Sequence, residues 1–209
     1  MLRYSLRLIV VLTSVLLLPM LLIRAQPAAD DSDLRMILAA PDDCPAPCFM
    51  GIRPGVTTAF EADDLLRNHE WAGRVIRPFG FGSSLFSGEL PWEWSDTRPG
   101  HIIKSYRGFL TIEYGRVRAL SFWTDIPIAD FRLLLGEQDV QHLYISRREP
   151  PLVVHSLHYG DSGWQLAANI PCPIVSVWDA GDRSRVLLTL TARPRLEQDS
   201  ATWLQVYNC

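Results

Sequence analysis

The feature that most constrains the fold is a β-hairpin pattern between Phe109 and Trp123. Two runs of β-forming residues flank a turn at Gly115, and apolar and polar side chains alternate along the first run. Alternation with a period of two is typical of a strand that buries one face. Because strands joined by a short turn pair in opposite directions, the chain must build an antiparallel sheet.

Further runs of β-forming residues predict more strands. A second hairpin is expected where Gly160-Asp161-Ser162-Gly163 joins two such runs. Outside the first hairpin, we expect strands at Arg74–Pro78, Pro91–Ser95, His142–Ser146, Leu152–Tyr159, Trp164–Asn169, Ile174–Trp178, Val186–Thr191 and Thr202–Tyr207.

A short amphipathic helix is predicted after the turn at Arg53-Pro54-Gly55. Thr58 is its N-cap, and Glu61 stands three residues later, which is the spacing of a capping box. The helix dipole explains the acidic residues in its first two turns, so they predict no metal site. The expected buried face consists of Ala62, Leu65, Leu66 and His69.

A second helix is expected from Asp125, its N-cap, to Gly136, which stops it, with Pro127 in the first turn. Its buried stripe is Ile128, Phe131 and Leu135. The segments EADDLLRNHE and IADFRLLLGE align, and each precedes a hairpin, which indicates a degenerate tandem repeat with halves 44–123 and 124–209. The sequence therefore predicts an α+β fold, an antiparallel sheet with two helices packed on one face.

The N-terminus predicts export. Arg3 and Arg7 precede an apolar run from Leu8 to Ile23, which is short for a membrane span and suits a signal peptide. Residues 1–25 are accordingly a cleaved signal peptide or a retained N-terminal anchor, residues 26–43 a linker, and residues 44–209 the exported domain. We expect an extracytoplasmic protein, secreted or held at the membrane by this segment alone.

Four cysteines in an exported chain predict two structural disulfides. The short Cys44-Pro-Ala-Pro-Cys48 segment could close a local loop and leave Cys172 to pair with Cys209. Alternatively, each N-terminal cysteine could reach a C-terminal one. The residues alone do not select among the three connectivities.

The composition excludes some functions. The formal net charge is −3 and no cluster of Lys or Arg stands out, so we expect no nucleic-acid partner. His155 and His158, the only close histidine pair, would point to opposite faces of a strand and could not chelate one metal. No motif of a metalloprotease or serine hydrolase occurs. We therefore assign no catalytic residue, metal or cofactor, and expect a protein that is not an enzyme.

The aromatic residues suggest a different kind of site. Trp92 and Trp94 would share one strand face, with Tyr106 near in sequence. If this pair faces solvent, it could stack on a sugar ring or anchor a partner; otherwise it fills the core. Trp164, Trp178 and Trp203 lie inside strand patterns and are expected in the core.

Two short motifs carry a resemblance to a known family. Ile52-x-Pro54-Gly55-x-Thr57-Thr58 leads into the acidic helix, and Tyr114-Gly115-Arg116-Val117 forms the hairpin turn. Over about half of the mature chain this resembles small exported modules of the BamE and β-lactamase-inhibitor-protein type. That resemblance implies a non-enzymatic module that acts in outer-membrane assembly or binds another protein. The chain departs from the pattern in the insertion 71–108, in its cysteine-bearing tail and in lacking a lipoprotein cysteine. The chain is also similar to other exported bacterial proteins, for which only a fold is implied.

Three hypotheses follow. The first is an exported, non-enzymatic module that binds a protein or another component of the cell envelope. The second is a carbohydrate-binding domain that uses Trp92 and Trp94. The third is a hydrolase whose site is not recognisable in the sequence.

Overall fold

The computed structural model describes residues 32–39, 43–81, 86–146, 151–171 and 185–192. The chain divides into two compact units, Met1–Asp31 and Ser32–Cys209. In the first unit only Thr13, Val15, Leu17 and Leu18 are described, and all four are helical. No helix in the described part of the chain is long and apolar enough to cross a membrane. The predicted strands at 174–178 and 202–207 lie outside the described residues.

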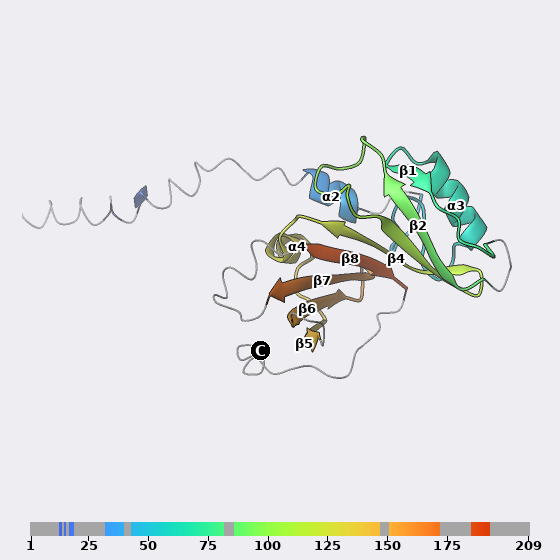
Figure 1. Ribbon diagram of the computed structural model, residues 1–209. Helices are drawn as coiled ribbons and strands as arrows, with labels where there is room; N and C mark the ends of the chain where they lie inside the picture. Colours follow the sequence, from blue (N-terminus) through green and yellow to red (C-terminus); the bar gives the residue numbers. More distant parts are fainter. Residues whose placement is uncertain are drawn as a thin grey trace, which may run out of the picture. The chain divides into compact units, whose positions relative to one another are not determined.

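The described part of the second unit is α+β, as the sequence predicted, with one eight-stranded antiparallel sheet and three short helices (Figure 1). The helices are α2 (Ser32–Leu38), α3 (Ala59–Asn68) and α4 (Ile128–Leu135). The strands are β1 (Ala72–Val75), β2 (Gly88–Trp94), β3 (Gly108–Glu113), β4 (Arg116–Thr124), β5 (Val140–Ser146), β6 (Leu152–Tyr159), β7 (Trp164–Pro171) and β8 (Val186–Thr191).

The strand order is β1-β2-β3-β4-β8-β7-β6-β5. Strands β1 to β4 form one meander after α3, and β5 to β8 form a second meander after α4. The two meanders meet where β4 pairs antiparallel with β8. The same order of elements therefore occurs twice, as the predicted repeat requires.

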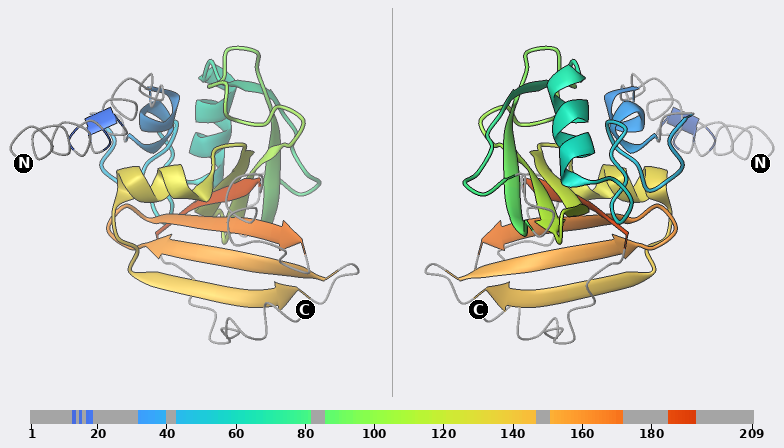
Figure 2. Two further views of the ribbon diagram at one scale, coloured as in Figure 1. Left: turned by 90° about the vertical axis from the view of Figure 1, so that its left-hand side faces the viewer. Right: turned by 90° about the vertical axis from the view of Figure 1, so that its right-hand side faces the viewer.

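One hydrophobic core serves both meanders. Ile37 of α2, Leu66 of α3 and Phe131 of α4 are fully buried in the same cluster. The strands add alternate residues of one sheet face, among them Leu110, Leu120, Phe122, Leu166, Leu188 and Leu190. Figure 2 shows the three helices on one side of the sheet. Each large apolar side chain buried in this way contributes about 1.5–3 kcal/mol before entropy is counted.

Helix α2 corrects the assignment of residues 26–43 to a linker. Leu34 and Ile37, three residues apart on one helix face, are buried in the core. Asp33 also accepts a hydrogen bond from the backbone N–H of Gly100 (2.9 Å). The prediction rested on the Ala, Asp and Pro content of the segment and overlooked this apolar pair.

Helix α3 begins as predicted. Thr58 is the N-cap, its side chain accepts from Glu61 N–H, and the Glu61 carboxylate accepts from Thr58 N–H (2.8 Å). The predicted buried face is partly wrong, because Leu65 is 36% exposed while Asp63 is only 3% exposed. His69 is half-buried at the C-cap, where its Nδ1 accepts from Trp71 N–H (3.1 Å).

Asp63 lies on the inner face of α3, where Leu65 was expected, because two arginines bind its carboxylate. Asp63 accepts hydrogen bonds from Arg67, one turn later in α3, and from Arg77, which follows β1. Burial alone would raise the pKa of Asp63, but the hydrogen bonds from Arg77 and Arg67 outweigh it and hold that pKa below its usual value. The ion pair between Asp63 and Arg77 therefore connects α3 to the segment that follows the edge strand β1.

Helix α4 ends as predicted, at Gly136, which has a positive φ of 79°. Its start differs, because Pro127 is the N-cap and no side chain caps the helix. Asp125, the predicted cap, instead lies 2.9 Å from Nδ1 of His101. Ile128 and Phe131 are buried as predicted, whereas Leu135 is only partly buried.

The two indoles of β2 lie in the core and do not form the solvent-facing pair that a stacking site would need. Trp92 is 0% and Trp94 is 3% exposed, and their ring centroids are 5.2 Å apart. Trp92 stands opposite Gly108 of β3, and its indole covers the space that a side chain would occupy there. The hypothesis that these residues fill the core is confirmed.

Replacing Asp63 by Asn should destabilise the protein by about 2 kcal/mol, because two half-exposed arginines lose a buried partner and partly regain water. Urea unfolding measures this. Asp64→Asn is the matched control, since Asp64 is exposed on the same helix turn, and it should change stability by less than about 0.5 kcal/mol.

The difference between wild type and Asp63→Asn should depend on pH. Because the folded-state pKa of Asp63 is lowered, its contribution is complete above the unfolded value of about 3.9 and disappears as pH falls through the folded value. Unfolding curves of both proteins between pH 7 and pH 2 measure this. If the difference in unfolding free energy between the two proteins stays constant down to pH 2, Asp63 does not stabilise the fold as an ionised carboxylate.

Gly108→Ala should destabilise by about 3 kcal/mol through overpacking, since its Cβ would lie 2.1 Å from Cζ2 of Trp92. The same substitution should change the near-ultraviolet circular dichroism of the buried indoles of Trp92 and Trp94. Gly100→Ala is the control, because its Cβ would make only an ordinary contact, 3.4 Å from Oδ2 of Asp33. Equal effects of the two substitutions would refute this packing.

Candidate functional site

The four cysteines are only partly placed. Cys44 and Cys48 form a disulfide with a Cα–Cα distance of 6.0 Å, so the local loop is the connectivity adopted by this pair. The alternative in which each of them reaches a C-terminal cysteine is wrong. Cys172 and Cys209 lie outside the described residues.

The residues predicted to stack on a ligand do not form one platform. Trp92 and Trp94 are buried, and of the three only Tyr106 is exposed, at 37%. The guanidinium of Arg185 lies 5.1 Å from the Tyr106 ring centroid and also donates to its hydroxyl. Trp164 is in the core as predicted, while Trp178 and Trp203 lie outside the described residues.

The histidines offer no metal centre in the described part of the chain, where no group of three or more His, Cys, Asp or Glu side chains comes together. His155 and His158 point to opposite sheet faces, and Nε2 of His158 lies 3.3 Å from Oγ of Ser156. That Ser–His pair does not support a hydrolase. Both residues are under 5% exposed, so a substrate could not reach the hydroxyl.

A more open site arises where the two motifs of the resemblance meet. The turn at residues 53–57 docks on the β3–β4 hairpin through backbone hydrogen bonds. Gly55 N–H donates to the carbonyl of Val117 (2.7 Å), and Val117 N–H donates to the carbonyl of Thr57 (2.9 Å). Ala59 N–H, at the start of α3, donates to the carbonyl of Gly115 (2.9 Å). The two segments therefore form one rigid unit.

The hairpin presents its polar side chains to solvent at this place. Tyr114 and Gly115 both have positive φ angles (49° and 72°), as a two-residue hairpin turn of type I′ requires. A bulge follows, because Ile112 pairs with Val117 while Thr111 pairs with Ala119. Val117 is buried, and its neighbours Arg116 and Arg118 are both exposed.

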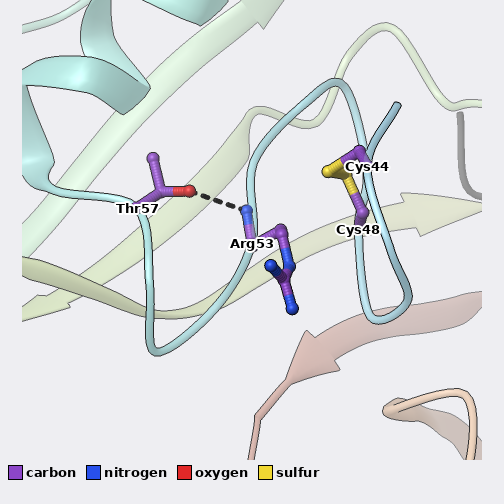
Figure 3. The surroundings of a disulfide bond; sticks show 4 residues. All are labelled: Cys44, Cys48, Arg53 and Thr57. Atoms are coloured by element: carbon purple, nitrogen blue, oxygen red, sulfur yellow. Dashed lines mark hydrogen bonds between the residues drawn. A yellow bond between two sulfur atoms is a disulfide. The ribbon is translucent and has the colours of Figure 1, made fainter.

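The disulfide loop closes another side of the site. Pro47, inside the loop, packs so closely on Gly163 of the β6–β7 turn that a Cβ there would lie 2.6 Å from the Cβ of Pro47. Figure 3 shows Arg53 next to the disulfide, with its backbone N–H bonded to Oγ1 of Thr57 (2.8 Å). Segments from both meanders thus surround one depression.

That depression is a cleft of about 800 Å³. Its walls carry three arginines, Arg53, Arg116 and Arg118, and one carboxylate, Glu113. The complete lining is Pro47, Arg53, Pro54, Gly55, Val56, Glu113, Tyr114, Arg116, Val117, Arg118, Thr191 and Ala192. The cleft is therefore positively charged in a chain whose formal net charge is −3.

The three arginines are not equivalent. Arg118 forms an ion pair with Glu113, and Nη1 of Arg116 donates to the carbonyl of Val56 (2.8 Å). Arg53 is different, because its Nε is buried and has no hydrogen-bond acceptor among the described residues. Only the Nε of Arg53 is buried in this way, so an incoming anion would meet its two Nη groups, which also have no hydrogen-bond acceptor among the described residues.

The sequence patterns identified the Pro54-Gly55 turn and the Tyr114-Gly115 turn, but they predicted no site at either of them. The available signal was an arginine next to each turn, Arg53 before Pro54 and Arg116 after Gly115. Spacing along the chain could not show that the two turns touch, because they are about sixty residues apart and belong to different local elements.

Comparisons of this chain with protein-family models, with curated proteins and with solved structures found no match. The described residues must therefore indicate the function by themselves. Since a fold hosts many functions, the chemistry of the cleft has to carry the conclusion.

The disulfide next to the cleft should contribute measurably to stability. Replacing Cys44 and Cys48 together by Ser removes a closed loop with a sequence separation of 4, for which the chain-entropy relation gives about 2 kcal/mol. Urea unfolding of the wild type and of the double variant, both without reductant, measures this difference. Mass spectrometry after non-reducing digestion that finds Cys44 and Cys48 in separate cross-links would contradict the structure.

Proposed function

We propose that the chain is an exported binding module that engages another protein of the cell envelope through the cleft at residues 53–56 and 113–118. The observation that carries the proposal is the docking of the Pro-Gly turn on the Tyr-Gly hairpin. It places three arginines beside exposed apolar side chains on a rigid frame. The export signal and the resemblance to protein-binding modules agree with this role.

The side chains around the cleft are of the kinds found at the centres of protein interfaces. Tyr114 and Val56, which both line the cleft, are 77% and 51% exposed. Tyr and Arg are over-represented among the residues that dominate binding energy. Exposed apolar residues that gather in one place favour a partner more than isolated ones do.

Rigidity also supports binding. The turn, the hairpin and the start of α3 are joined by backbone hydrogen bonds, and the disulfide closes the adjoining loop. A preorganised surface loses little conformational entropy when a partner binds. The cleft can therefore hold its arginines and Tyr114 in position before the partner arrives.

Photo-cross-linking in the native host tests the proposal. A benzoylphenylalanine at position 114 should form an adduct with a specific envelope protein, because this side chain stands at the rim of the cleft. Leu133 of α4, which is 84% exposed and does not line the cleft, is the control position. Adducts at 133 identical to those at 114, or no protein adduct at 114, would refute the proposed surface.

The purified adduct partner should then bind the isolated protein, and Tyr114→Asn should weaken that binding by about 2 kcal/mol, near thirtyfold. Asn-Gly is a preferred sequence for this turn, so the substitution removes the aromatic ring and keeps the hairpin. Isothermal titration calorimetry measures the affinity. Unchanged affinity of the Asn variant would contradict the role of Tyr114.

A further inference from the structure

The charges in the cleft are not balanced. Glu113 is already paired with Arg118, so its negative charge is used within the hairpin. Arg116 donates to a backbone carbonyl and also interacts electrostatically with the carboxylate of Glu61. No carboxylate of the described residues pairs with Arg53. The cleft thus holds one guanidinium group, that of Arg53, without a counter-charge among the described residues.

The backbone of Arg53 is held in place by hydrogen bonds of the turn. Its backbone N–H donates to Oγ1 of Thr57, and its carbonyl accepts from Val56 N–H (3.1 Å) and Thr57 N–H (3.0 Å). Pro54 follows it and restricts its backbone. The buried Nε of Arg53 has no acceptor among the described residues, so the Nη groups are the donors that a ligand in the cleft can reach. Two parallel hydrogen bonds from the two Nη groups to a carboxylate would use the accessible edge of the planar guanidinium.

The surroundings favour a carboxylate on a protein over a small free anion. Val56 and Tyr114, at the rim next to the arginines, offer apolar area that a free inorganic anion would not use. An acidic segment with neighbouring apolar side chains would use both the charge and that area. Charge complementarity with an acidic partner also disfavours the binding of proteins that are not acidic at the contacting surface.

We propose that the cleft is a carboxylate-binding site in which Arg53 receives an Asp or Glu side chain of an acidic segment of the partner protein. This inference rests on the proposed function, because it names the chemistry of the partner for the same cleft. Arg116 lines the same cleft and adds positive charge, and Tyr114 and Val56 cover the apolar residues beside the carboxylate.

The test uses the purified full chain, labelled with ¹⁵N, and two blocked peptides, acetyl-Phe-Asp-Glu-Phe-amide and its isosteric match acetyl-Phe-Asn-Gln-Phe-amide. The Nε–H signal of Arg53, assigned by its loss in Arg53→Lys, should shift saturably with the acidic peptide. The amide peptide should bind at least about tenfold more weakly, since a charge-assisted hydrogen bond is replaced by a neutral one.

Variants separate this site from general electrostatics. Arg53→Gln should weaken binding of the acidic peptide at least about tenfold. Arg53→Lys, which keeps the charge and loses the planar fork, should be intermediate. Arg74→Gln removes the same charge from an exposed position of β1 outside the cleft and should leave the affinity unchanged. Backbone amide spectra of all three variants establish that the fold is intact.

Four results would overturn the inference. They are equal binding of the two peptides, equal weakening by Arg53→Gln and Arg74→Gln, binding of inorganic phosphate as tight as that of the acidic peptide, and concentration-dependent self-association that Arg53→Gln abolishes. The last would identify a second copy of the chain as the occupant.

The same variants distinguish this failure from failure of the proposed function. If the cross-link at position 114 and the affinity for its partner survive in Arg53→Gln, the protein-binding role stands and the carboxylate site is refuted. If no partner cross-links at position 114, the proposed function fails whatever the peptides do.

Discussion

The antiparallel pairing of β4 with β8 is the interaction on which the rest of the structure depends. Each meander ends in one of these strands, and their register runs from Ala119 opposite Thr191 to Thr124 opposite Val186. Inward residues of β4 therefore lie beside inward residues of β8, and both meanders share one core. Small four-stranded units bury little apolar surface by themselves, so a shared core stabilises each half.

The same pairing explains where the cleft lies. The first residues of β4 are next to the last residues of β8, and the turn at residues 53–57 docks on that edge of the hairpin. The disulfide loop reaches the β6–β7 turn through Pro47. The cleft therefore consists of segments that only the joined sheet brings together, which is why its arginines are so far apart in sequence.

Local patterns in the sequence predicted most elements correctly, because short-range physical chemistry decides them. Alternation and turn residues located both hairpins, and the Thr58–Glu61 spacing located the start of α3. The errors share one cause. Period-two alternation correctly placed Trp92 and Trp94 on one face of β2, but it does not say which face is covered. Likewise, helical spacing left Asp63 off the predicted buried face of α3, and only the contact with Arg77, beyond β1, made its burial favourable.

Residues a few positions apart are enough to specify the α+β class, the repeated order of helix and strands, the capped helix and the two turns. Tertiary structure decided which sheet face is buried, which cysteine Cys44 pairs with, that residues 32–38 join the core, and that Arg53 lines the same cleft as Arg116 and Arg118. These outcomes depend on contacts between segments that are far apart in the sequence. Local patterns do not predict such contacts, because they form only when both meanders pack on a common core.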